Sequence, residues 1–412
     1  MNNLLNIKSF LKFLKGNKAY TAIDVFGLSV SLMFVILIAV YTVQELSVDK
    51  FHTDGDRIYV LTSDMGPVSG LPIAYNLKER YPEIEKVCPV ISTGVAPQTV
   101  KRNETKLTAK VIATDSCFFN FFSFKLLEGD AKRALEDRGN VVLSRTFANK
   151  LFGTESPVGQ SVVIGDSTSY MVGGVMEDIK NSTIPYADLL MRAERANEFN
   201  GSISMEHSGN AGAAVPFLMM KPGADLTPKI DDILSYFKES FWPYKQGMWK
   251  EVGLMPLHDM YFSGSQGFGA VQFGNKRFVI VLLSVGILIL IFAIFNYINL
   301  TVAQAGQRAK EMATRRLLGS SRKELFLRLM EESTLLTVLS FGIGWLLALA
   351  AVPFVNNLLQ TKVDMWGTFT PVWIMAAIVL ILLIGFLSGL LPAVLISSVK
   401  PIDIVRGTFR RQ

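Results

Sequence analysis

Charged residues at helical spacing form the most informative cluster in this sequence. Arg308, Glu311 and Arg315 are three and four residues apart, so a helix would place them on one face. With the neighbouring Arg316 and with Gly319, such a face could dock a protein partner. The same pattern also suits a solvated face held by ion pairs, and the spacing alone does not choose between the two.

Residues suited to catalysis are few and scattered. His52, His207 and His258 lack the close spacing of a metal motif. The nucleophile motif G-x-S-x-G does not occur, and the run Ser263-Gly264-Ser265 does not complete it. The phosphate-binding motif G-x-x-x-x-G-K-[ST] is also absent from the sequence. We therefore expect no catalytic residue, no metal and no cofactor, and we expect a separate subunit to hydrolyse any ATP.

Two cysteines, Cys88 and Cys117, are present. Both lie in a region that we expect outside the cytoplasm, where a disulfide can form. Two unpaired buried cysteines are the alternative, and the sequence does not show whether the two residues meet.

Four apolar segments can each cross a bilayer, which needs roughly 20 helical residues. The chain has 412 residues, of which 50% are hydrophobic and 18% charged, and the apolar residues are clustered. The predicted spans are residues 23–43, 278–298, 335–355 and 372–396. The last three contain no charged residue, so a membrane protein is predicted.

The basic residues predict the orientation of these spans. Fifteen Lys and Arg oppose five Asp and Glu in three segments, residues 1–22, 299–334 and 397–412, which we expect in the cytoplasm. Both termini are then cytoplasmic, the first span is an uncleaved signal anchor, and residues 44–277 and 356–371 lie outside. The basic balance therefore reflects topology, and we expect no binding to nucleic acid.

The predicted fold is a four-helix transmembrane bundle with a large α+β extracytoplasmic domain inserted between the first two spans. We expect two subdomains in this insert, divided near residue 120 and rejoined near residue 220. A helix is predicted over Leu71–Tyr81, ending before Pro82. The predicted strands are Arg57–Thr62, Leu107–Ala113, Val141–Ser144, Ser161–Ile164 and Tyr170–Val175.

Residues 299–334, which we call the elbow, must position the charged cluster. Ala309–Leu318 favour a helix, and Gly319 is placed to end it. Ser321 and Glu324 form the pattern of a capping box, so a second helix should run from Arg322 into the third span.

Four small or polar residues in the spans or at their ends are assigned to helix packing. We expect Asn296 and Asn299 to hydrogen-bond between helices, and Gly385 and Gly389 to allow close helix contact.

Several motifs resemble the MacB and FtsX type of ABC permease family. The run R-A-K-E-M-A-T-R-R-L-L-G-S-S-R, residues 308–322, is similar to the cytoplasmic signature of that family. Five motifs follow the order of its periplasmic core domain: F-F-N-F-F-S-F at 118–124, L-L-E-G-D at 126–130, L-F-G at 151–153, S-P-V-G-Q at 156–160 and V-G-G-V at 172–175. Phe51-His52, with D-R-I-Y at 56–59, resembles the segment after the first span in one bacterial branch.

The resemblance implies an inner-membrane permease subunit that transmits motion from a separate cytoplasmic ABC ATPase to a periplasmic domain. Arg308, Glu311, Arg315, Arg316 and Gly319 are then the expected ATPase contacts. The MacB exporter carries a fused ATPase domain, whereas only about 22 residues precede the first span here.

The expected partners are that ATPase, a second permease in a homodimer or heterodimer, membrane lipids and in some assemblies a periplasmic adaptor. Export of an antibiotic-like, peptide or lipoprotein substrate is the favoured function. The alternatives are FtsX-like control of cell-wall hydrolases and a membrane receptor or signalling protein.

Overall fold

The chain divides into two compact units. The computed structural model describes residues 18–92, 96–165, 167–206, 210–264, 270–303, 314–359, 361–367 and 370–398. The helical unit contains Met1–Gln44 and Arg277–Gln412, and the large domain contains Glu45–Lys276.

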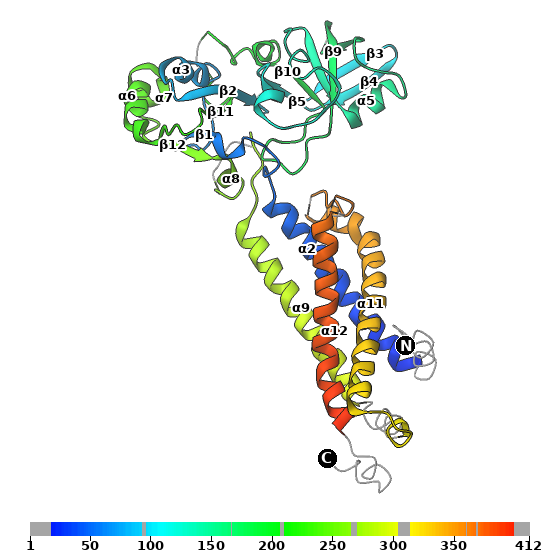
Figure 1. Ribbon diagram of the computed structural model, residues 1–412. Helices are drawn as coiled ribbons and strands as arrows, with labels where there is room; N and C mark the ends of the chain where they lie inside the picture. Colours follow the sequence, from blue (N-terminus) through cyan, green and yellow to red (C-terminus); the bar gives the residue numbers. More distant parts are fainter. Residues whose placement is uncertain are drawn as a thin grey trace. The chain divides into compact units, whose positions relative to one another are not determined.

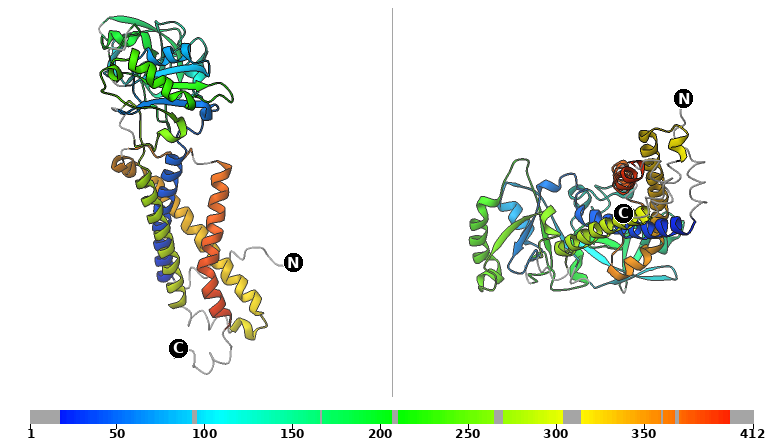
Figure 2. Two further views of the ribbon diagram at one scale, coloured as in Figure 1. Left: turned by 90° about the vertical axis from the view of Figure 1, so that its left-hand side faces the viewer. Right: turned by 90° about the horizontal axis from the view of Figure 1, so that it is seen from below.

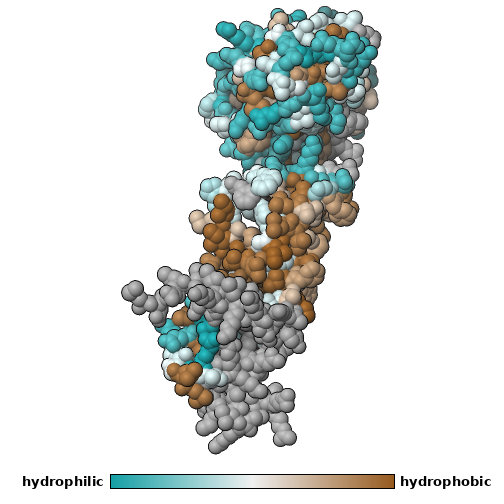
Figure 3. Space-filling model, turned by 90° about the vertical axis from the view of Figure 1, so that its right-hand side faces the viewer, coloured by the Kyte–Doolittle hydropathy of each residue, from teal (hydrophilic) through white to brown (hydrophobic). Residues whose placement is uncertain are grey.

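Four helices of the helical unit are long and apolar enough to span a bilayer. They are α2 (Lys18–Leu46), α9 (Lys276–Ala303), α11 (Arg322–Leu359) and α12 (Pro371–Ser398), and they lie side by side in Figures 1 and 2. The predicted four-helix transmembrane arrangement is therefore confirmed. Much of the outward surface is apolar, seen as a brown belt in Figure 3, as a bundle in lipid requires.

Small residues set the distances between these helices. A Cβ atom added to Gly344 of α11 would lie 2.9 Å from the backbone oxygen of Ser29 in α2. On α12, a Cβ at Gly385 or Gly389 would lie 2.9 Å from the side-chain oxygen of Thr334 or Ser333 in α11. The predicted close packing at Gly385 and Gly389 is thus confirmed.

Within the described residues of this chain, Asn296 and Asn299 do not form the expected hydrogen bonds to other helices. Both side chains are exposed on α9, and within the described residues neither amide has a partner on another helix. Tyr297 lies between them on the inward face and donates its hydroxyl to Ser333 Oγ of α11 at 3.0 Å. The prediction is therefore not met within this chain, because sequence shows that an amide lies in a span but not which way it faces.

The large domain is built on one mixed sheet of twelve strands among the described residues. In order across the sheet the strands run β12-β1-β11-β2-β5-β10-β7-β9-β8-β3-β4, and β6 pairs with β9 (Figure 1). Pairs β5 with β10 and β7 with β9 are parallel, and the other pairs are antiparallel. The strands are β1 (Ile58–Ser63), β2 (Ile84–Ile91), β3 (Gln98–Arg102), β4 (Thr105–Ala109), β5 (Val111–Thr114), β6 (Leu126–Gly129), β7 (Asn140–Ser144), β8 (Ser161–Ile164), β9 (Thr168–Met176), β10 (Leu189–Arg192), β11 (Val215–Met220) and β12 (Val252–Pro256).

Short helices pack on this sheet and bury two hydrophobic clusters. The α-helices are α3 (Ile73–Arg80), α4 (Phe118–Phe121), α5 (Arg145–Phe152), α6 (Ile230–Ser240), α7 (Trp242–Lys245) and α8 (Leu257–Met260), and the 3-10 helices are η1 (Gly55–Arg57), η2 (Ala193–Glu198) and η3 (Thr227–Lys229). One cluster centres on buried Phe118, Phe122 and Phe217. The other centres on Phe147 and Tyr170. The sheet runs through both clusters without a break.

Most local predictions for this domain are confirmed, with one correction. The predicted helix is α3, which stops at Arg80, and four of the five predicted strands are β1, β7, β8 and β9. The predicted strand Leu107–Ala113 was wrong, because it is divided into β4 and β5 at Lys110. There Lys110 N donates to the Asp188 carboxylate at 2.9 Å and Lys110 O accepts from Asp188 N at 2.9 Å. The chain then leaves β3 to pair with β2 and β10. A change of strand partner does not alter the alternation of apolar and polar residues along the chain, so the sequence pattern does not reveal it.

Candidate coupling site and polar networks of the large domain

The elbow contains a tightly defined turn at Gly319. The short helix before it is described from Thr314, and it ends at this glycine, whose φ is +102°. Ser320 N donates to Arg315 O at 3.1 Å, and Gly319 N donates to Arg316 O at 3.1 Å. This pair of bonds is a Schellman motif, which needs a residue with positive φ at this position. The predicted helix end at Gly319 is confirmed.

The next helix begins with the predicted capping box. Ser321 N donates to Glu324 Oε2 at 3.1 Å, and Glu324 N donates to Ser321 Oγ at 3.2 Å. These reciprocal bonds satisfy the first free amides of α11. Helix α11 then continues as one 38-residue helix from Arg322 to Leu359. Residues 315–324 thus form two helix ends joined by a fixed turn.

The structure places only part of the predicted docking cluster. Arg315 and Arg316 are half-buried and Gly319 is exposed. Arg308 and Glu311 lie outside the described residues, so the predicted common face of Arg308, Glu311 and Arg315 stays a prediction.

Sequence reasoning missed two apolar residues on this turn. Leu317 and Leu318 are 69% and 83% exposed, beside the predicted contact residues. The sequence signal was available, because the two leucines directly precede the helix-ending glycine. An exposed apolar pair next to basic residues is suited to a protein contact.

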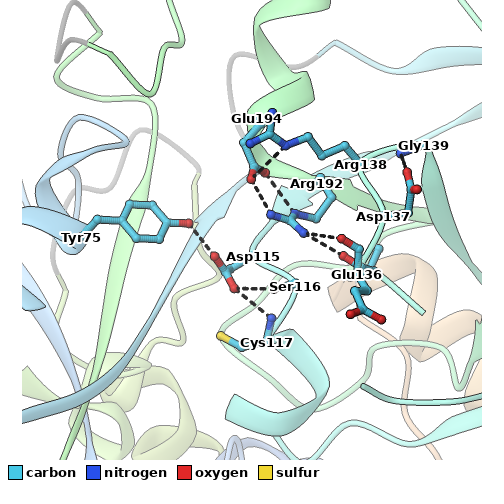
Figure 4. Close-up of polar contacts among 11 residues, drawn as sticks. Tyr75, Asp115, Ser116, Cys117, Glu136, Asp137, Arg138, Gly139, Arg192 and Glu194 are labelled. Atoms are coloured by element: carbon cyan, nitrogen blue, oxygen red, sulfur yellow. Dashed lines mark hydrogen bonds and ion pairs between the residues drawn. The ribbon is translucent and has the colours of Figure 1, made fainter. Parts of the chain in front are cut away.

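Two neighbouring groups of polar contacts lie in the large domain, one joining α3 to the segment after β5 and the other around β10 (Figure 4). Tyr75 donates its hydroxyl to Asp115 Oδ2 at 2.7 Å, and Cys117 N donates to Asp115 Oδ1 at 2.9 Å. Burial alone would raise the pKa of Asp115, but the hydrogen bonds from Cys117 and Tyr75 outweigh burial and lower it. Burial and the negative Asp115 raise the pKa of Tyr75. Asp115 is therefore an ionised acceptor and Tyr75 a neutral donor.

Arg192 is the centre of the second group. Its guanidinium pairs with Glu194, and its Nη1 donates to the backbone oxygens of Leu135 and Glu136 at 3.1 and 2.9 Å. Burial would lower the pKa of Arg192, but the Glu194 carboxylate raises it. Arg192 is thus ion-paired and Asp115 is hydrogen-bonded by neutral donors, which suits a structural role more than a reactive centre.

The two cysteines meet but remain thiols. Cys117 Sγ lies 3.3 Å from Val87 O, and Cys88 Sγ lies 3.4 Å from Thr114 Oγ1. A hydrogen bond with Cys88, followed by burial, raises the pKa of the Cys117 thiol. A thiol with a raised pKa is a poor nucleophile, so Cys117 is not a candidate reactive cysteine.

The histidines occupy separate places. His258 Nε2 lies 3.3 Å from Asp56 Oδ1, His52 is buried beside Asp49, and His207 lies outside the described residues. The described part of the chain contains no group of three metal-ligating side chains.

An open cavity of about 620 Å³ lies in the large domain. Its lining is largely apolar and consists of Met65, Ser202, Asn210, Ala211, Gly212, Trp242, Pro243, Met248 and Trp249. Its volume lies in the range of small-molecule pockets, about 300–1,000 Å³. Sequence reasoning missed this cavity because its lining comes from three distant segments.

Two family descriptions match the chain. The MacB-like periplasmic core domain matches residues 21–232, just over half of the chain, and the FtsX-like permease C-terminal domain matches residues 283–401.

Among curated proteins, the chain is similar to the macrolide export ATP-binding/permease proteins MacB. It is 23% identical to the one from Agrobacterium fabrum over 330 residues, 78% of this chain and 46% of that protein. It is 22% identical to the one from Hahella chejuensis over 340 residues, with the same two coverages. The chain therefore spans about half the length of the curated relatives it matches.

Two solved structures are also similar. A domain of a putative permease protein from Porphyromonas gingivalis aligns with a TM-score of 0.43 at 16% identity, covering 56% of this chain and 99% of that one. The periplasmic region of MacB from Actinobacillus actinomycetemcomitans aligns with a TM-score of 0.35 at 15% identity, covering 49% and 89%.

Taken together, the matched family descriptions and the four membrane-length helices lead to one conclusion. The chain belongs to the MacB and FtsX family of ABC-type permeases and is a multi-pass protein of the inner membrane.

Proposed function

We propose that this chain transmits ATP-driven motion from a separate cytoplasmic ATPase to its large domain in the periplasm. The observation that carries the proposal is the capped turn at Gly319 and Ser321, which continues into α11. At 1.5 Å per residue, α11 is about 57 Å long. A force on the elbow would therefore act on a stiff rod that begins at a fixed turn.

The ATPase contact is assigned to Arg308, Glu311, Arg315, Arg316 and Gly319. Exposed Leu317 and Leu318 support this assignment, because an interface needs an apolar centre as well as charged residues at its rim. The basic side chains would pair with acidic residues of the ATPase. ATP hydrolysis is assigned to the partner because the sequence contains no phosphate-binding glycine-rich motif.

Orientation follows from charge. The excess of Lys and Arg in residues 1–22, 299–334 and 397–412 favours a cytoplasmic location for the elbow and for both ends of the chain. The large domain then faces the periplasm.

A second permease subunit is also proposed. Asn296 and Asn299 are exposed on the same face of α9, three residues apart. An amide without a hydrogen-bond partner is costly in the hydrocarbon region, and a neighbouring subunit would supply partners.

Export of an antibiotic-like, peptide or lipoprotein substrate is the proposed outcome of this motion. The apolar cavity at Trp242 and Trp249 supports a substrate with an apolar group. The name of the curated relatives, macrolide export proteins, points the same way.

Purification of the tagged chain from native membranes, followed by mass spectrometry and an assay of vanadate-sensitive ATP hydrolysis, tests the coupling role. We expect an ABC ATPase to co-purify. A double variant, Glu311→Ala with Arg315→Ala, should reduce the recovered ATPase at least about tenfold, since loss of roughly 1.4 kcal/mol of binding free energy has that effect.

Arg277→Ala is the matched control, because it removes a basic residue at the opposite end of the helical unit. It should leave ATPase recovery unchanged. Undiminished recovery with the double variant would show that the docking assignment is wrong.

A further inference from the structure

A buried carboxylate lies where the chain enters the large domain. Asp49 follows the end of α2 by three residues, its side chain is 1% exposed, and its φ is +59°. Its carboxylate accepts hydrogen bonds from Ser182 Oγ at 2.6 Å, Thr183 Oγ1 at 2.7 Å and Thr183 N at 3.0 Å. A buried carboxylate is tolerated only with such partners, so Asp49 is held firmly in this place.

The backbone around Asp49 is bound to the same loop. Asp49 N donates to Asn181 O at 3.0 Å, and Asn181 Nδ2 donates to Ser47 O at 3.0 Å. Residues 45–52, which we call the first tether, thus both donate hydrogen bonds to residues 181–183 and accept hydrogen bonds from them. This loop connects β9 and β10, two strands inside the sheet.

The chain leaving the domain is bound to the same loop. We call residues 270–275, which lead into α9, the second tether. Gln272 N donates to Thr183 O at 2.8 Å. Thr183 therefore contacts both tethers. Its amide and hydroxyl donate to Asp49 of the first tether, and its carbonyl accepts from Gln272 of the second tether.

A second bridge joins the two tethers through Tyr261. Tyr261 donates its hydroxyl to Glu45 Oε2 at 2.9 Å and accepts from Gly274 N through its backbone oxygen at 2.8 Å. Gly274 lies close against the Tyr261 ring, since a Cβ atom added to Gly274 would lie 2.2 Å from a ring carbon of Tyr261. The two tethers are therefore linked twice.

His52 completes the environment of Asp49 without making it catalytic. Its Nδ1 accepts from Ser123 N at 3.0 Å, so the neutral ring carries its proton on Nε2, which lies 3.5 Å from Asp49 Oδ1. The Ser182 hydroxyl donates to Asp49 and not to His52. Among the described residues no histidine accepts the Ser182 hydroxyl, and the Asp49 carboxylate that does accept it is also bonded to Thr183, so the cluster suits a structural anchor more than a hydrolytic site.

We propose that Asp49 is the positioning residue that fixes both tethers to the β9–β10 loop. Motion of α2 and motion of α9 would then displace the sheet together. The inference rests on the proposed function, because it names the point at which motion reaches the large domain. Without this attachment, each tether would move as an independent flexible connection.

The test uses the full chain with its co-purified ATPase in lipid nanodiscs. Hydrogen–deuterium exchange of β9 and β10 is compared without nucleotide and with ATP plus vanadate. We expect a nucleotide-dependent change in the unsubstituted chain that falls at least about threefold in Asp49→Asn, while ATP hydrolysis continues. Asp115→Asn, which also neutralises a hydrogen-bonded carboxylate but contacts neither tether, should keep the full change.

Thermal unfolding of each complex checks that the variants are folded. If Asp49→Asn does not accumulate, Thr183→Val takes its place, since it removes one hydroxyl and keeps the side-chain volume. A full exchange response in the folded variant would overturn this inference alone. Absence of a response in the unsubstituted chain would overturn the proposed function and this inference with it.

Discussion

At the residue scale, charged side chains inside the large domain are held by partners rather than left reactive. Asp115 accepts from Tyr75 and Cys117, Arg192 is paired with Glu194, and the Cys117 thiol has a raised pKa. Such pairing removes the cost of burial without creating a nucleophile or a base. These contacts favour a large domain that keeps its shape, as the proposed transmission of motion requires.

The lowered pKa of Asp115 makes a stability prediction. Its ionised form stabilises the fold at pH values above its ordinary pKa of 3.8, and this stabilisation is lost as pH falls through the lowered folded pKa. Near neutral pH, Asp115→Asn should cost about 2 kcal/mol, because hydrogen bonds to a charged group are lost. Thermal unfolding followed by tryptophan fluorescence measures this cost in the detergent-solubilised chain.

Tyr75→Phe is the graded control, since it removes one donor and leaves Cys117 N in place. Its cost should be smaller than that of Asp115→Asn. The difference in unfolding free energy between Asp115→Asn and the unsubstituted chain should disappear in strong acid. A difference that stays constant down to about pH 3 would mean that ionisation of Asp115 does not stabilise the fold.

At the element scale, glycines decide how closely the membrane helices approach. Gly344 lets α11 contact the backbone of α2, and Gly385 and Gly389 let α12 contact α11. Lipid supplies no hydrophobic force between helices, so close packing of this kind is the main source of their association.

Two glycines of α11 provide a matched pair of variants. A Cβ at Gly344 would lie 2.9 Å from Ser29 O, whereas a Cβ at Gly342 meets nothing within 4 Å. Gly344→Ala should destabilise the helical unit by roughly 2 kcal/mol through overpacking. Gly342→Ala should cause no loss, because alanine favours helix more than glycine does.

The measurement is the melting temperature of the purified chain in one detergent at one concentration. Equal melting temperatures for the two variants would show that the α2–α11 contact at Gly344 does not limit stability.

At the scale of the whole molecule, the proposed orientation places the elbow and the large domain on opposite sides of the membrane. Two exposed positions report on it: Gly201 in the large domain, where a Cβ meets nothing within 4 Å, and Leu318 on the elbow, which is 83% exposed. In spheroplasts, a membrane-impermeant maleimide should label Gly201→Cys at once and Leu318→Cys only after permeabilisation.

The unsubstituted chain is the control for this labelling. Cys88 is buried and the Cys117 thiol has a raised pKa, so the background should be low. Immediate labelling of Leu318→Cys together with protection of Gly201→Cys would mean the reverse orientation.

The amino-acid sequence by itself determined the features that depend on neighbours along the chain. The membrane helices follow from apolar length, and the turn at Gly319, Ser321 and Glu324 follows from helix-end chemistry within ten residues. Strands β1, β7, β8 and β9 likewise follow from local residue patterns. The family resemblance rests on motifs of the same local kind.

Only the tertiary structure decided which distant groups meet. Three contacts join residues far apart in sequence: Lys110 with Asp188 at the strand break, Tyr297 with Ser333, and Asp49 with Ser182 and Thr183. A lone aspartate after a membrane span looks like any solvated charge until the fold brings donors to it. Pairing energies depend on distance in space, whereas a sequence pattern records distance along the chain, and for these contacts the two are unrelated.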